Sequence, residues 1–203
     1  MSYTLLLDCS DKYLSLGISQ ENEIIYKKSF YAWQRQSEYL IPEIKKALEE
    51  SNISIKNIST IALGIGPGSY TGVRIPLAIA KTLAVVNKVK IIPLSSLQIM
   101  GTHEEKYISL MNARSNRSYI GIYDHGKNVI EDQVIENDKI MDFIEPYVEK
   151  GFTLKGDLSY LNLDLEVRYD VINGLLSYSS INLPIEDPKT IKPVYLKDNY
   201  EYH

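Results

Sequence analysis

Short apolar runs near the start of the chain alternate with polar residues and predict β-strands. Three such runs, at residues 3–10, 13–19 and 23–30, are rich in β-forming residues. The breaks between them, DK and QEN, are typical of turns. We therefore expect a three-stranded meander at the N-terminus.

Helical periodicity follows over residues 37–50, where apolar residues recur at positions 40, 41, 44 and 48. Ser37 is the expected N-cap residue of this helix. A strand at 59–66 then leads through a glycine-rich turn into a long apolar helix over 71–87. A buried strand is expected at 89–96.

From about residue 105 the pattern starts again. Strands are expected at 105–113, 117–126 and 129–137, with Asp124, His125 and Gly126 in a hairpin turn. Asp138 is the expected cap of a helix over 138–150. The remaining expected elements are a strand at 151–157, a short helix at 171–182 and an extended tail from about 188.

Each half of the chain thus has the element order β-β-β-α-β-α, although their residues show no self-similarity. A repeated order predicts an α/β protein of two lobes, each a mixed sheet with packed helices. We expect the first lobe over residues 1–100 and the second over 101–203. The tail from about 188 is a candidate for packing back on the first lobe.

The glycine-rich turn at 64–72 matches no common nucleotide or nucleophile motif. The spacing of its glycines does not match that of the Walker A loop, the dinucleotide fingerprint or the nucleophile elbow. Two interpretations stay open. In one, backbone N–H groups of the turn bind an anion; in the other, glycine supplies backbone freedom and Ser69 or Thr71 caps the helix. The residues of the anion interpretation are Gly66, Gly68, Ser69, Thr71 and Gly72.

The helix over 71–87 is apolar around nearly its whole circumference, apart from a stripe through Arg74, Ala78 and Lys81. Such a helix is buried on more than one side. One side faces the sheet. The other faces either a second molecule, which Ala78, Ala80 and Ala84 would let approach closely, or the rest of its own chain.

Composition restricts the function classes. The formal net charge is −4, which argues against a domain that holds nucleic acid through its own phosphate contacts. The single cysteine, Cys9, excludes an internal disulfide, and no histidine spacing suits a metal. We expect no metal and no cofactor. Without a signal peptide or membrane-spanning segment, the expected location is the cytoplasm.

Asp8 ends the first strand, at the place where actin-like and sugar-kinase-like ATPases keep a carboxylate linked to a metal. The corresponding place in the second half holds Asn112, and the turns after both strands lack glycine. Asp8 with Asn112 is half of the carboxylate pair that usually holds the magnesium of a nucleotide. The sequence therefore predicts a site unsuited to ATP, and Asp8 is alternatively a plain turn residue.

The segment GPGSYTGVRIPLAIAKTLA at 66–84 closely resembles the signature of the TsaB/YeaZ family. Further matches run in order along the chain. They are LLLDCSDKYLSLGI, QSEYLIPEI, IPLSSLQIM, NARSNRSYIGIY and PVYLK.

The resemblance implies a two-lobed fold of the actin/Hsp70/sugar-kinase (ribonuclease H-like) class. It also implies a non-catalytic subunit of the bacterial machinery that makes threonylcarbamoyladenosine at position 37 of tRNA. Its partners would be the catalytic paralogue TsaD, the ATPase TsaE in the full complex, and a second copy in a homodimer. Transfer RNA would be contacted only through the complex. No catalytic residue is expected.

By this resemblance the partner interface lies on the helices at 37–50 and 71–87. Its expected residues are Tyr39, Leu40, Glu43, Tyr70, Thr71, Arg74, Leu77, Ala78, Lys81 and Ala84. Gln36, Asn112 and Pro76 depart from the family pattern, which usually has histidine, aspartate and glycine there. Pro76 implies that the long helix begins near Gly72 or kinks.

Two other functions stay open. One is a divergent nucleotide-binding enzyme. The other is a peptidase acting on TsaD, for which the sequence shows no nucleophile–base pair.

Overall fold

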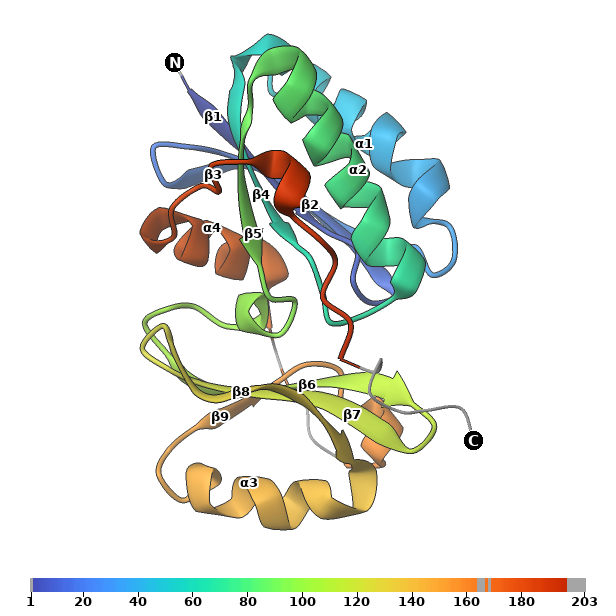
Figure 1. The fold of residues 1–203 in the computed structure, drawn as a ribbon, viewed down its shortest axis with the longest axis vertical. Coiled ribbons are helices and arrows are strands. Elements are labelled where there is room, and N and C mark those ends of the chain that lie inside the picture. Colours follow the sequence, from blue (N-terminus) through green and yellow to red (C-terminus); the bar gives the residue numbers. More distant parts are fainter. Residues whose placement is uncertain (1, 164–166, 168, 197–203) are drawn as a thin grey trace.

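The computed structural model describes residues 2–163, 167 and 169–196, and it contains two mixed β-sheets (Figure 1). The first sheet has the strand order β3-β2-β1-β4-β5. The meander is antiparallel, whereas β4 and β5 join it in parallel. The three-stranded meander predicted from the sequence is therefore confirmed. The strands are β1 (Tyr3–Asp8), β2 (Tyr13–Gln20), β3 (Glu23–Tyr31), β4 (Ile58–Gly64) and β5 (Lys90–Leu94).

Helices cover both faces of the first sheet. The helices α1 (Gln36–Glu50) and α2 (Tyr70–Asn87) lie side by side on one face, and α4 (Val171–Ile181) lies on the other (Figure 1). In the described part of the chain, no helix is both long enough and apolar enough to cross a bilayer.

The second sheet has the order β8-β7-β6-β9 and carries α3 (Ile140–Val148) on its outer face (Figure 1). His125 and Gly126 connect β7 and β8 with φ values of 47° and 81°, as the predicted hairpin turn requires. The strands are β6 (Lys106–Arg114), β7 (Arg117–Asp124), β8 (Lys127–Glu136) and β9 (Thr153–Lys155).

Alternation along the central strands builds three cores. In β1, Leu5 and Leu7 face α1 and α2, while Leu6 faces the space between the sheets. In β6, Ile108 faces a core between the second sheet and α3. Tyr107, Met111 and Ala113 point the other way, into a middle core between the two sheets. Because side chains of a strand point alternately to opposite faces, each sheet is apolar on both sides.

The middle core joins the two halves of the chain through α4. A Cβ atom added to Gly17 of β2 would lie 2.6 Å from Ile172, and one added to Gly174 would lie 1.9 Å from the Ile99 carbonyl oxygen. Glycine at these positions lets α4 pack directly on the first sheet and on the connection between the sheets. A boundary near residue 100 thus separates the two sheets but leaves α4 against the first of them.

Several helix starts differ from the prediction. Helix α1 begins at Gln36 after Arg35, which makes no side-chain cap, so Ser37 lies inside the first turn. The Gln36 side chain donates to the Asp11 carbonyl oxygen at 3.0 Å instead. Asp138 lies in a 3-10 turn, Asn137–Lys139, that precedes α3, so the predicted cap there is wrong as well.

Helix α2 begins at Tyr70, and Pro76 lies inside it. Of the two alternatives that Pro76 raised, a start near Gly72 is therefore wrong, and a kink stays a prediction. Ser69 is the cap, and its Oγ accepts from the Gly72 N–H at 3.2 Å. The tail is not wholly extended either, because Pro188–Thr190 form a 3-10 turn whose start is capped by Asp187.

Candidate functional site

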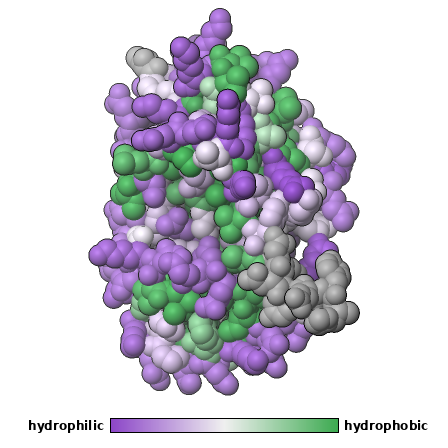
Figure 2. Space-filling view, viewed as in Figure 1, coloured by the Kyte–Doolittle hydropathy of each residue, from purple (hydrophilic) through white to green (hydrophobic). Residues whose placement is uncertain are grey.

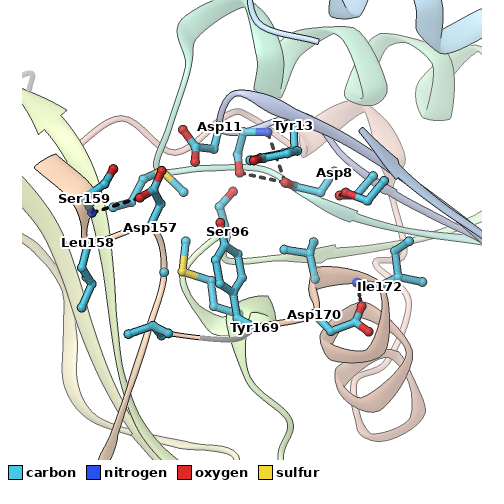
Figure 3. Close-up of a pocket in the computed structure, with 18 of the residues that line it drawn as sticks. Asp8, Asp11, Tyr13, Ser96, Asp157, Leu158, Ser159, Tyr169, Asp170 and Ile172 are labelled. Carbon is cyan, nitrogen blue, oxygen red and sulfur yellow. Dashed lines mark hydrogen bonds between the residues drawn. The ribbon is translucent and has the colours of Figure 1, made fainter. Parts of the chain in front are cut away.

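A cavity of about 690 Å³ lies between the two lobes (Figure 3). Its walls are formed by the end of β1 and the loop after it, by residues of β2 and β3, by Ser96 after β5, and by the segments 156–159 and 169–172. Its polar lining is Asp8, Ser10, Asp11, Tyr13, Ser15, Lys27, Ser29, Ser96, Asp157, Ser159, Tyr169 and Asp170.

Asp8 is the most deeply buried acid of this cleft, with 5% of its surface exposed. Ser10 donates to Asp8 Oδ2 from its Oγ at 3.0 Å and from its backbone N–H at 3.3 Å (Figure 3). Asp8 Oδ1 is buried and accepts no hydrogen bond within the described residues. Burial raises the pKa of Asp8 to about 7, because the Ser10 hydrogen bonds offset only part of the desolvation.

Two ion pairs border the cleft and join segments from opposite halves of the chain. Lys12 pairs with Asp157, and Lys27 pairs with Asp170. The side chains of the first pair are about one third exposed, so each pair is worth little on its own. They nevertheless hold segments from opposite halves of the chain on the two sides of one cavity.

The lining suits a nucleotide poorly. Four aspartates and one lysine face the cleft, whereas a polyphosphate needs cations and free backbone N–H groups. Within the described residues, no group of three or more His, Cys, Asp or Glu side chains is arranged to hold a metal ion. Asn112, the residue expected opposite Asp8, does not line this cleft; it is exposed, and its Oδ1 accepts from the Arg114 N–H at 2.7 Å.

A second candidate site is an apolar groove of about 610 Å³ between α1 and α2. Further along α2, Val85 and Val86 are 72% and 71% exposed. Hydrophobic surface is visible at the upper end of α2 (Figure 2). The groove is lined by Ile41, Ile44, Lys45, Leu48, Glu49, Ile53, Ile55, Ala78, Ile79, Thr82 and Leu83.

The residues expected at a partner interface fall into three groups. Tyr70, Thr71, Arg74 and Ala78 are exposed, and Tyr39, Glu43, Lys81 and Ala84 are half-buried. Leu40 and Leu77 belong to the core under the helices. Ala80, expected to let a neighbouring helix approach, also lies in that core and has no exposed surface. The exposed residues of the expected set on α2 are therefore Tyr70, Thr71, Arg74 and Ala78.

The glycine turn is shaped by close backbone contacts. A Cβ at Gly72 would lie 1.9 Å from the Cys9 carbonyl oxygen, and one at Gly68 would lie 2.4 Å from the Ser10 carbonyl oxygen. The N–H groups of Gly66, Ser69 and Gly72 donate to Ser96 Oγ, the Ser10 carbonyl and Ser69 Oγ. Three donors of the expected anion set are thus used inside the protein.

The structure also forms a serine–histidine contact that the sequence did not show. Ser177 Oγ on α4 lies 2.6 Å from His103 Nδ1 and accepts from the His103 backbone N–H at 2.9 Å. The sequence showed no nucleophile–base pair, and nothing in its pattern relates these two residues. Neither residue lines any of the cavities described above, so the contact ties α4 to the 101–105 loop.

Other site residues had no local signal in the sequence. Asp157, Asp170 and Lys27 reach the cleft only through tertiary packing, and Tyr195 of the tail lies on α2. The PVYLK match pointed to the segment that carries Tyr195, although not to its contacts.

Comparisons with known proteins agree with this structure. The family model for TsaD, tRNA N6-adenosine threonylcarbamoyltransferase, matches residues 31–183. The tRNA threonylcarbamoyladenosine biosynthesis protein TsaB of Bacillus subtilis is 32% identical over 152 residues, 72% of this chain and 66% of that protein. An uncharacterized Mycoplasma genitalium protein, MG208, is 28% identical over 206 residues, 97% of this chain and 95% of that protein.

Among solved structures, YeaZ from Pseudomonas aeruginosa superimposes with a TM-score of 0.74 at 21% identity. The match covers 97% of this chain and 100% of that chain. A second Pseudomonas aeruginosa structure, of an uncharacterized protein with similarity to peptidase YeaZ, gives a TM-score of 0.77 at 20% identity with the same coverage. With two mixed sheets and packed helices, the predicted two-lobed fold is confirmed.

Proposed function

Because this chain belongs to the TsaB/YeaZ family, with a role in threonylcarbamoyladenosine biosynthesis, we propose that it is a non-catalytic subunit that binds a TsaD-like paralogue. In this role it supports threonylcarbamoyl transfer to adenosine 37 of tRNA. A TsaE-like ATPase joins the complex, and the chain also pairs with itself.

The observation that carries the proposal is the groove between α1 and α2 with the exposed valines beyond it. Apolar surface of this kind marks protein interaction sites. The α2 crest (Arg74, Ala78, Thr82 and Val85) runs beside the groove along one face of the helix. A helix pair from a second chain would bury this crest and complete a four-helix arrangement. If the partner is a second copy, one patch meets itself, so homodimer and TsaD complex compete for one face.

Co-purification with the TsaD-like protein of the same organism tests the proposal. Ala78→Glu places a charge on the crest and should abolish association while the protein stays folded. Glu131→Ala, at an exposed position of β8 in the second lobe, is the control and should bind normally. Normal binding by Ala78→Glu would place the interface elsewhere.

The pure protein alone should neither hydrolyse ATP nor modify tRNA. This expectation is supported by the acidic cleft lining and by the incomplete Asp8–Asn112 pair. An ATPase assay on pure protein measures it. Turnover that disappears in Asp8→Asn would overturn the non-catalytic assignment and favour a divergent nucleotide enzyme.

A further inference from the structure

The C-terminal strap, residues 188–195, runs along α2 on the side away from α1 (Figure 1). Its Val194 N–H donates to the Ile65 carbonyl oxygen at 2.8 Å, and the Lys189 carbonyl accepts from Lys81 Nζ at 3.1 Å. Ile191 is buried in the core under α1 and α2. The strap is thus fixed to the first lobe through backbone, side-chain and apolar contacts.

At its end the strap builds an aromatic cluster around Arg74. The rings of Tyr70 and Tyr195 stack with centroids 5.3 Å apart. The Arg74 guanidinium carbon lies 3.6 Å from the Tyr70 centroid and 5.6 Å from the Tyr195 centroid. Arg74 Nε also donates to the Tyr195 hydroxyl at 2.7 Å. Two rings and one hydrogen bond therefore fix the orientation of a single cation.

This cation has no acidic partner within the described ranges 2–163, 167 and 169–196, where the ion pairs all involve other residues. A guanidinium has five N–H donors, and the Tyr195 contact uses one of them. Arg74 is exposed, as is Tyr70 with 59% of its surface. The remaining donors form a planar fork of the kind that binds a carboxylate through two hydrogen bonds.

The cluster continues the docking face. Arg74 lies one helical turn before Ala78, which lines the groove. A stable interface covers about 800 Å² on each partner. Because α2 is only about 27 Å long, an interface of that area extends along most of the helix. A chain docked along the α2 crest therefore also covers Arg74 and the strap beside it.

We propose that Tyr70, Arg74 and Tyr195 form a receptor for a carboxylate of the protein partner, and that the strap, by supplying Tyr195, is part of the docking face. The proposal rests on the function proposed above, because it takes the partner to be the TsaD-like chain. It adds the chemistry of the contact: an aspartate or glutamate side chain on the partner pairs with Arg74. An RNA phosphate is the competing ligand, and the net charge of −4 disfavours it.

Isothermal titration of the full chain with the TsaD-like protein, at several salt concentrations, tests the proposal. Arg74→Gln and Tyr195→Ala should each weaken binding about 10- to 100-fold, the usual value of a hydrogen-bonded charge. Arg74→Lys should recover only part of the affinity, because an ammonium lacks the fork. Arg74→Gln should also reduce the dependence of affinity on salt, which a merely structural role for the cluster would leave unchanged.

Two matched variants serve as controls. Lys150→Gln removes another exposed cation that lies over an aromatic ring, with its Nζ 6.0 Å from the Tyr147 centroid, just after α3 in the second lobe. Tyr31→Ala removes another exposed tyrosine, one that packs edge-on against Tyr13. Both should bind within about twofold of the wild type, a difference below about 0.5 kcal/mol. Thermal unfolding of all variants verifies that they are folded.

The outcomes separate this proposal from the previous one. If Arg74→Gln binds normally while Ala78→Glu does not, the receptor is wrong and the docking face stands. If both bind normally, the docking face itself is wrong. If Arg74→Gln leaves protein binding intact and lowers the affinity of the complex for tRNA, the cluster binds phosphate and the proposal is overturned.

Discussion

At the end of β1, the Asp8 carboxyl is held out of water between Ser10 and the Gly64 backbone. A Cβ at Gly64 would lie 2.2 Å from Asp8 Oδ1, so glycine is required for the carboxyl to fit. The carboxyl is thus enclosed without a cation beside it in the described part of the chain. Burial raises its pKa to about 7 from the ordinary 3.8, which links folding to pH.

Asp8 therefore lowers stability as the pH rises. Below pH 3.8 both folded and unfolded states hold the proton, so the group costs nothing. Between pH 3.8 and 7 only the unfolded state ionises, so the free energy of unfolding falls as the pH rises. Above pH 7 both states are ionised, and the total loss of unfolding free energy is at most about 4 kcal/mol. Asp8→Asn should accordingly be more stable than the wild type at pH 8, with a difference that vanishes by pH 4.

Urea unfolding at pH 4, 6 and 8 measures this difference. Asp138→Asn, at an exposed aspartate, is the matched control. A stability difference between Asp8→Asn and the wild type that stays constant from pH 4 to pH 8 would contradict the interpretation of Asp8.

At the scale of elements, the sequence pattern predicts that α2 is a helix but does not predict which of its faces is buried. The alternation of β1 and β2 and the hairpin at Asp124, His125 and Gly126 follow from local chemistry and were predicted. Apart from the stripe through Arg74, Ala78 and Lys81, the helix is apolar around its circumference, so its sequence does not say which part of the apolar surface meets the sheet. Packing on β1, β4 and β5 decides it, and places Ala80 inward and Ala78 outward.

The two alanines should consequently respond differently to glutamate. Ala80→Glu buries an unpaired carboxylate in the core. It should lower the free energy of unfolding by roughly several kcal/mol and so unfold or strongly destabilise the protein. Ala78→Glu should change the midpoint of thermal unfolding little. Circular dichroism melting curves compare them, and equal destabilisation would show that α2 is rotated from the orientation described.

Tertiary contacts also explain the other failures of prediction. The start of α1 is fixed by Gln36, which bonds Asp11 from a different part of the first lobe. The cleft joins Asp8 with Asp157 and Asp170, which lie far along the chain, and no local pattern relates them. Periodicity located α1 and α2, and the tail from about 188 was a candidate for packing on the first lobe, but the contacts of Tyr195 with α2 became visible only in the fold.

At the scale of the whole molecule, charge limits what the protein binds alone. The net charge is −4, and the cleft between the lobes is lined by four aspartates and one lysine. Binding to nucleic acid grows with the number of phosphates neutralised and falls steeply with salt. The molecule offers few such contacts by itself.

The isolated protein should therefore bind tRNA weakly, and the binding should disappear as salt rises from about 50 to 200 mM. Fluorescence anisotropy with labelled tRNA measures this. The complex with the TsaD-like partner, measured in parallel, shows how much affinity the partner supplies. Tight binding by the isolated protein at 200 mM salt would reveal a nucleic-acid surface on this chain.

The packing of α4 across the first sheet has a consequence for synthesis on the ribosome. The apolar residues of α4, with Ile172 against Gly17, are translated after every strand of both sheets. Until residues 171–181 leave the exit tunnel, the finished first sheet carries an uncovered apolar face. The nascent chain must pass through this stage before its core can close. It is then most exposed to aggregation and most dependent on chaperones that shield such surfaces.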